Sequence, residues 1–110
     1  MVVASPYLEI RPSELERSPV LHIITAVCDE FGVGGADILG TRRFRTVAEA
    51  RLLCYWLLRT RTRMSFPEIG QTMGRDHGTV MNGIRSVVKK LGSDKQFAQM
   101  VERVTERLDA

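Results

Sequence analysis

The fold of this chain is decided by residues 65–90, which read SFPEIGQTMGRDHGTVMNGIRSVVKK. Ser65 and Glu68 have the S-x-x-E spacing of a capping box, which predicts the start of a helix. Asp76 is of a residue type that commonly caps a helix, and it precedes a second helical pattern. In that pattern the apolar residues recur at spacings of three and four, at Val80, Ile84, Val87 and Leu91. The stretch therefore predicts two helices joined by a tight turn.

The residues before this stretch also show helical spacing. Ser18 can cap a helix that has proline at its first position, and Gly32 is expected to end that helix. A short helical piece is expected over residues 36–39. Thr46 with Glu49 forms another capping-box pattern, which predicts a long and deeply buried helix.

The residues after the stretch predict one further helix. Gly92 is expected to end the preceding helix, and Ser93 with Gln96 gives a third capping-box pattern before an amphipathic segment. No strand-like alternation of apolar and polar residues occurs along the chain. The sequence therefore predicts an all-α fold, a compact helical domain of about five helices that contains a helix-turn-helix.

The length of 110 residues corresponds to one domain. Residues 1–18 contain three Xaa-Pro steps, and proline disfavours helix at the residue that precedes it. We therefore expect a partly extended leader or linker over residues 1–18 and a helical domain over residues 19–110.

The composition argues against several classes of protein. Apolar residues make up 44% of the chain and charged residues 26%, values that are ordinary for a soluble domain. No apolar run is long enough to cross a bilayer, and the first residues lack the pattern of a secretion signal. Cys28 and Cys54 fall at apolar helical positions, and the histidines are not spaced to complete a metal site. We expect a cytoplasmic protein with no metal, cofactor or small-molecule substrate.

The charge is unevenly distributed along the chain. The net charge is only +3, but residues 41–90 carry eleven Lys and Arg side chains against three carboxylates. A concentrated cationic region favours a polyanionic partner such as DNA, although charge runs are also common on solvated helix surfaces.

The second helix of the stretch supplies candidates for contact with DNA bases. A recognition helix reads base edges mainly through its first turn, and the residues placed there are Arg75, Asp76, His77 and Thr79. Arginine can pair with guanine, and aspartate can accept a hydrogen bond from cytosine. Two alternatives stay open, because Asp76 can act only as a helix cap and His77 can pack over the neighbouring helix.

Other residues are candidates for contact with the DNA backbone. The later turns of a recognition helix diverge toward the phosphates, and the polar residues there are Asn82, Arg85 and Lys89. A basic loop, TRRFR at residues 41–45, can enter the adjacent minor groove or remain a solvated loop. Its arginines are Arg42, Arg43 and Arg45. Arg59, shortly before the helix-turn-helix, is a further phosphate candidate.

Three segments together resemble a known family, namely TRRFRTVAEARLL, SFPEIG and GRDHGTV. They are similar to the C-terminal DNA-binding domain of the bacterial chromosomal replication initiator DnaA, over roughly residues 20–108. The resemblance implies a Trp-repressor-like helix-turn-helix that binds short asymmetric duplex sites. It implies that Arg43 enters the minor groove, that Arg51 contacts the backbone, and that the RDH-x-T residues read bases. Ser65 and Pro67 are implied to lie near the phosphates.

The chain departs from the family pattern in three ways. Gly78 stands where the family usually has threonine, and Met73 where it often has a second glycine. Loss of a methyl contact with thymine predicts a relaxed or shifted sequence preference. No G-x-x-x-x-G-K-[ST] loop occurs, so the ATPase module of the initiator is missing from these residues and we expect no enzyme. The chain is either a self-standing relative or a fragment of a longer protein.

These observations predict a sequence-selective double-stranded DNA-binding protein that acts in replication control or transcriptional regulation at the nucleoid. A replication protein is a further candidate partner, and a membrane is not. The alternative is a protein-interaction module that keeps the fold but engages a replication partner instead of DNA. Apolar residues exposed on the last helix or on the leader would favour that alternative.

Overall fold

The computed structural model describes residues 18–41 and 44–110. Two predicted DNA contacts, Arg42 and Arg43, lie outside the described residues, as does nearly all of the predicted leader. The division of the chain into residues 1–18 and 19–110 therefore stays a prediction.

All of the regular structure in the described part of the chain is helical, which confirms the predicted all-α class. The helices are α2 (Pro19–Phe31), α3 (Gly35–Leu39), α4 (Arg45–Arg61), α5 (Phe66–Met73), α6 (His77–Ser93) and α7 (Lys95–Asp109). The short α3 is the expected helical piece, and it brings the number in these residues from the predicted five to six. α5 and α6 with the turn between them form the predicted helix-turn-helix.

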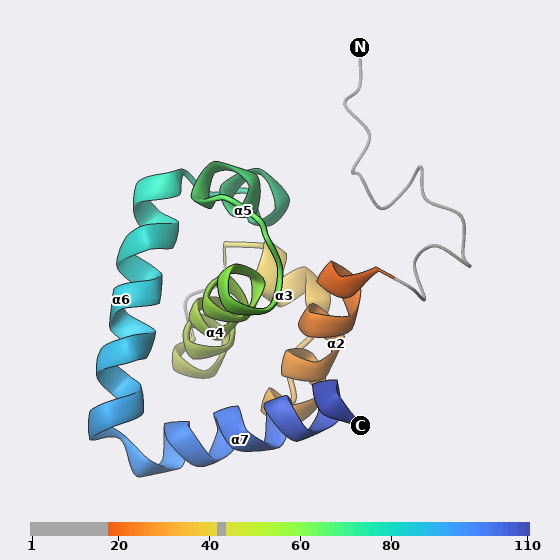
Figure 1. Ribbon diagram of the computed structural model, residues 1–110, viewed down its shortest axis with the longest axis vertical. Coiled ribbons are helices and arrows are strands. Elements are labelled where there is room, and N and C mark those ends of the chain that lie inside the picture. Colours follow the sequence, from red (N-terminus) through yellow and green to blue (C-terminus); the bar gives the residue numbers. More distant parts are fainter. Residues whose placement is uncertain (1–17, 42–43) are drawn as a thin grey trace.

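Helix α4 lies at the centre of the molecule, as Figure 1 shows, with α2 and α6 on either side of it. α5 covers one end of this arrangement and α7 lies across the other. Leu53, Cys54 and Leu58 of α4 are completely buried, which confirms the predicted deep burial of this helix. Cys54 and the half-buried Cys28 are free thiols.

Helix α6 approaches α4 closely because a glycine stands at their contact. Gly83 is buried, and a Cβ at this position would lie 2.7 Å from Tyr55 Cδ2 and 2.9 Å from Leu52 Cδ2. These separations are shorter than van der Waals contact, so a larger residue fits only if Tyr55 and Leu52 or α6 itself are displaced. The approach fixes how far the opposite, polar side of α6 projects from the core.

Four helix boundaries that depend on local patterns are confirmed. Ser18 accepts a hydrogen bond from the backbone of Leu21 at the start of α2, and Gly32 ends that helix with φ 67°. Ser65 and Glu68 form the predicted capping box of α5, and Asp76 caps α6. In each case the residues that satisfy the free backbone groups lie within the same turn.

Three predicted boundaries are wrong. α4 begins at Arg45 and not at Thr46, because the Glu49 carboxylate accepts from Arg45 and Lys90 instead of closing a capping box. α6 continues past Gly92 to Ser93. Its neighbour Asp94, and not Ser93, caps α7 by accepting from the backbone N–H of Phe97 at 3.1 Å.

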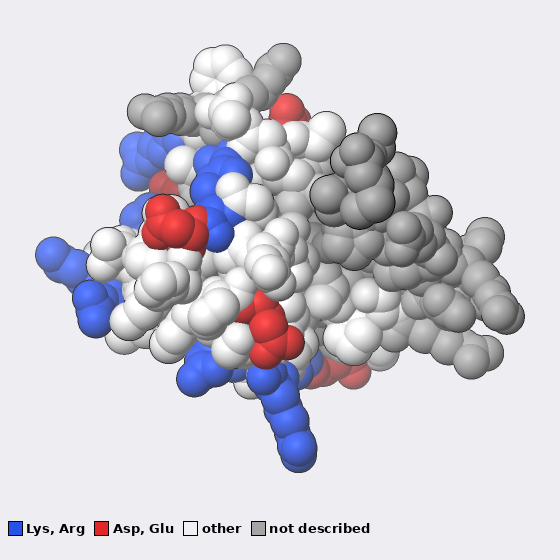
Figure 2. Space-filling model, turned by 90° about the horizontal axis from the view of Figure 1, so that it is seen from above, with Lys and Arg blue, Asp and Glu red and all other residues white. Residues whose placement is uncertain are grey.

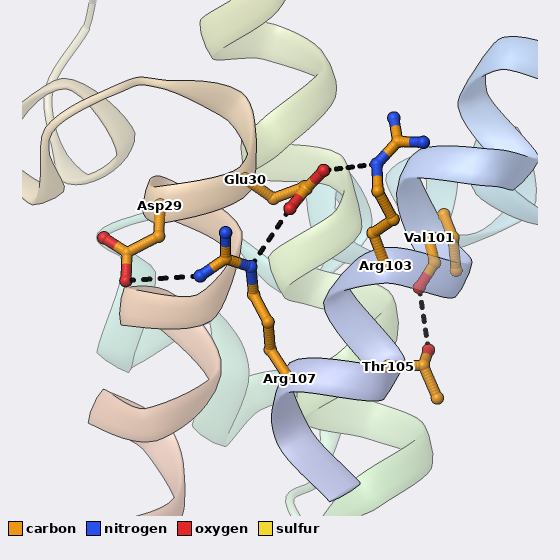
Figure 3. A network of polar contacts seen from close by, with 6 residues as sticks. All are labelled: Asp29, Glu30, Val101, Arg103, Thr105 and Arg107. Carbon is orange, nitrogen blue, oxygen red and sulfur yellow. Dashed lines mark hydrogen bonds and ion pairs between the residues drawn. The ribbon is translucent and has the colours of Figure 1, made fainter. Parts of the chain in front are cut away.

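Helix α7 is joined to α2 by ion pairs, shown in Figure 3. Both oxygens of Glu30 are engaged, one by Arg103 and the other by Arg107 at 3.0 Å. Arg107 also lies 4.0 Å from Asp29. The hydrogen bond from Arg103, supported by the one from Arg107, lowers the pKa of Glu30. No helix in the described residues is long and apolar enough to span a bilayer.

Candidate nucleic-acid interface

The turn between α5 and α6 is built on two glycines. Gly74 ends α5 with φ 68°, a conformation that residues with a Cβ rarely adopt. The backbone N–H groups of Gly74 and Arg75 both donate to the carbonyl of Gly70, the latter at 2.8 Å. A Cβ at Gly70 would lie only 2.4 Å from the Arg75 carbonyl oxygen. Sequence reasoning missed both glycines, although glycine within helical spacing is a known sign of close backbone approach.

The first turn of α6 is held by Asp76. Its Oδ1 accepts from the Thr79 backbone N–H at 2.8 Å, and its Oδ2 accepts from the Thr79 hydroxyl at 3.2 Å. These two bonds, the backbone one first, lower the pKa of Asp76. Asp76, His77 and Thr79 are exposed, so the first turn presents their side chains to solvent. The helix-capping alternative for Asp76 describes its observed contacts, whereas His77 is not packed into the core.

The polar side of α6 is open along its length. Val80, Gly83 and Val87 are buried against the rest of the protein. The exposed residues on the other side include the three predicted backbone contacts, Asn82, Arg85 and Lys89. Arg85 donates to the side-chain oxygen of Asn82 at 3.4 Å.

Arg51 lies elsewhere than its predicted role requires. It is buried, with 9% of its surface exposed, and its guanidinium donates to three backbone carbonyls. The acceptors are Ile38 at 2.8 Å, Asp37 at 2.9 Å and Gly40 at 3.1 Å. Burial, with the nearby charge of Arg75 second, lowers the pKa of Arg51. The reason is that the end of α3 offers carbonyls without helical partners, which the forked guanidinium satisfies from inside the domain.

Arg75 also engages backbone carbonyls. Its guanidinium donates to Gly74 at 3.0 Å, to Met73 at 3.3 Å and to Gly40, the carbonyl that Arg51 also contacts. The side chain is half-buried at the turn. It lies next to the first turn of α6, but its donors point back toward the protein.

The remaining candidates lie around the helix-turn-helix. The side chain of Arg45 is 85% exposed and contacts Glu49. Arg59 stacks over the ring of Phe66 at 4.5 Å and donates to the Met64 carbonyl. Figure 2, seen from the α5 end, shows Lys and Arg side chains at several edges, separated by uncharged residues and some carboxylates. Ser65 and the exposed Pro67 form the first turn of α5, where backbone N–H groups without helical partners gather.

The chain matches, over residues 20–87, the model of the family described as the bacterial dnaA protein helix-turn-helix. The chain belongs to this family. It is 40% identical to the chromosomal replication initiator protein DnaA of Thermus thermophilus over 86% of its own length and 22% of the relative. It is 37% identical to the DnaA of Xanthobacter autotrophicus over 84% of its length and 19% of the relative.

The chain thus spans about a fifth of the length of the DnaA proteins that it matches. Membership of the DnaA helix-turn-helix family confirms the resemblance found in the sequence. This helix-turn-helix is a DNA-binding domain and not a catalytic one. Within the described residues, no group of three His, Cys, Asp or Glu side chains is arranged to hold a metal ion.

Proposed function

We propose that the chain binds short asymmetric duplex DNA sites with sequence preference and acts in replication initiation. The first turn of α6 enters the major groove, and Arg43 enters the adjacent minor groove. The observation that carries the proposal is the exposure of His77, Thr79 and the whole polar side of α6, in a family of DNA-binding helix-turn-helix domains.

The base contacts are assigned to the start of α6. His77 and Thr79 supply donors, acceptors and a methyl group at the part of the helix that meets base edges. Asp76 accepts two bonds from Thr79, and its oxygens keep further acceptor capacity for cytosine N4. Gly78 leaves the position between His77 and Thr79 without a side chain, which supports a shifted sequence preference. Arg75 is left out of this set because its donors engage backbone carbonyls.

The phosphate contacts are assigned to residues that flank this turn, all of the described ones exposed except the half-buried Ser65. On α6 they come from Asn82, Arg85 and Lys89, and near α5 from Arg59, Ser65 and Pro67. The basic loop adds Arg42 and Arg45. Arg51 is left out because its guanidinium is buried and bonded to α3.

Salt dependence tests the electrostatic part of the proposal. If five cations reach phosphates, the logarithm of the affinity falls with that of the salt concentration at a slope of about −4 to −5. The affinity then drops roughly a thousandfold between about 50 and 200 mM salt. Fluorescence anisotropy on a duplex chosen by selection from a random library measures this slope. A slope near zero would exclude phosphate-based binding.

Variants test the base-reading part. His77→Ala and Arg43→Ala should lower affinity for the selected duplex more than for a random one, each by about tenfold or more, because a base contact is lost. Lys89→Ala should weaken both duplexes alike. Lys95→Ala removes the same charge from an exposed position at the start of α7 and serves as the matched control. Equal losses on both duplexes for all variants would contradict base reading.

The cellular role follows from the DNA site. We propose that the chain works at the nucleoid in the cytoplasm, in replication control or in transcriptional regulation, with a replication protein as a further partner. A pure protein-interaction module is less well supported. The large apolar side chains exposed in the described residues are Phe44 and Val88, and neither lies on α7.

A further inference from the structure

Two arginines from distant parts of the chain converge on one backbone carbonyl. Gly40 accepts a hydrogen bond from Arg51 in α4 at 3.1 Å and a second one from Arg75 in the turn of the helix-turn-helix. Gly40 ends α3 and directly precedes the basic loop at residues 41–45. Arg75 is therefore bonded across 35 positions of sequence to the residue from which the basic loop starts.

The backbone at Gly40 is shaped for this contact. A Cβ there would lie 2.7 Å from the carbonyl oxygen of Ala36, which is backbone and cannot move aside without distorting α3. φ of Gly40 is −88°, so glycine is needed here for space and not for an unusual dihedral angle. Any side chain at this position would shift the carbonyl away from the two guanidinium groups.

The two arginines differ in what they hold. Arg51 is buried and bonds to three carbonyls at the end of α3, so it fixes that end to α4. Arg75 is half-buried and bonds to Met73 and Gly74 at the end of α5 as well as to Gly40. It is the described side chain that links the α5–α6 turn directly to the start of the loop.

We propose that Arg75 is a positioning residue, which bonds the turn of the helix-turn-helix to Gly40 so that the basic loop and the recognition helix meet DNA as one unit. Arg75 on this account reads no base. The inference rests on the proposed function, because it concerns how two DNA-contacting segments are set relative to each other.

A double-mutant comparison separates positioning from base reading. Library selection and anisotropy titrations are made for Arg75→Ala, Arg43→Ala, His77→Ala and the double variants. Arg75→Ala should lower discrimination by about tenfold at the base pairs that Arg43→Ala affects, and leave those affected by His77→Ala intact. The Arg43/Arg75 double variant should lose little more discrimination than Arg43→Ala alone, since the effects of mutations in one coupled unit are not additive.

The opposite pattern overturns the inference. If Arg75 reads a base, Arg75→Ala abolishes the preference at a position of its own, and the losses in the Arg43/Arg75 double variant multiply. Gly40→Ala is the second variant, since it changes no side chain assigned to DNA. It should reproduce the Arg75→Ala selection profile, and an unchanged profile with a native circular dichroism spectrum would contradict the proposal. Arg75→Lys retains the charge but not the fork, and it should rescue less than half of the lost discrimination.

Hydrogen exchange tests the link without DNA. In Arg75→Ala the amides of Gly40, Thr41 and Phe44 should exchange about tenfold faster, and in Arg85→Ala they should not. Unchanged exchange in Arg75→Ala would overturn the link whatever the DNA result. Faster exchange together with no preference of the wild-type protein for any duplex would instead overturn the proposed function alone.

Discussion

At the scale of single residues, two glycines of the same helix have opposite environments. A Cβ at Gly83 would meet Tyr55 and Leu52 at 2.7 and 2.9 Å, whereas a Cβ at Gly92 would meet nothing within 4 Å. We expect Gly83→Ala to lower the free energy of unfolding by about 1–3 kcal/mol through overpacking, despite the better helix propensity of alanine. Gly92→Ala should raise it by less than about 0.5 kcal/mol, because Gly92 lies in the last turn of α6, where the propensity gain is smaller than in a helix interior. Urea unfolding followed by circular dichroism measures both, and changes of the same sign would contradict the assigned contact at Gly83.

Single residues also show where sequence reasoning about the site stops. The sequence correctly singled out the helix-turn-helix and the residues at its turn, because caps and helical spacing are local properties. It could not show that Arg51 turns inward or that Arg75 folds back on Gly40, since the carbonyls that they satisfy come from α3 and from the loop start. A charge pattern gives the number of arginines in a region but not the acceptors that tertiary structure brings to them.

At the scale of helices, the start of α7 shows that a capping-box spacing in the sequence does not always identify the residue that caps the helix. Ser93 matched the capping-box spacing, but the N–H of Phe97 is bonded to Asp94. We expect Asp94→Ala to lower the free energy of unfolding by about 1 kcal/mol, while Asp94→Asn, which can still accept this bond, changes it little. Ser93→Ala should cost less than about 0.5 kcal/mol, because its hydroxyl only supports the exposed last turn of α6 at Lys89. Thermal unfolding of the three variants checks this order, and a larger loss for Ser93→Ala would restore the sequence-based assignment.

The wrong boundaries of α4 and α7 have different physical reasons. At α4, the Glu49 carboxylate accepts a hydrogen bond from Lys90 of α6. Lys90 lies 41 positions away in the sequence, so no local pattern could predict this partner. At α7, two adjacent residues could both cap, and the path of the chain out of α6 selects Asp94. The starts of α2, α5 and α6 were predicted correctly because each cap bonds a backbone N–H within its own first turn.

At the scale of the whole molecule, α7 packs on α2 through buried apolar residues, and the ion pairs of Glu30 add to this contact. Because hydrogen bonds from Arg103 and Arg107 lower its pKa in the folded state, its contribution to stability is complete above the unfolded-state pKa, roughly 4.3, and is lost as the pH falls through the folded-state pKa. Glu30→Gln should therefore be less stable than the wild-type protein at neutral pH, and this difference should close as the pH falls below the lowered folded-state pKa of Glu30. Urea unfolding at a series of pH values measures the difference, with Glu102→Gln as a control at an exposed position of α7. A constant difference at all pH values would show that Glu30 contributes through packing alone, and that its charge plays no part in holding α7 to α2.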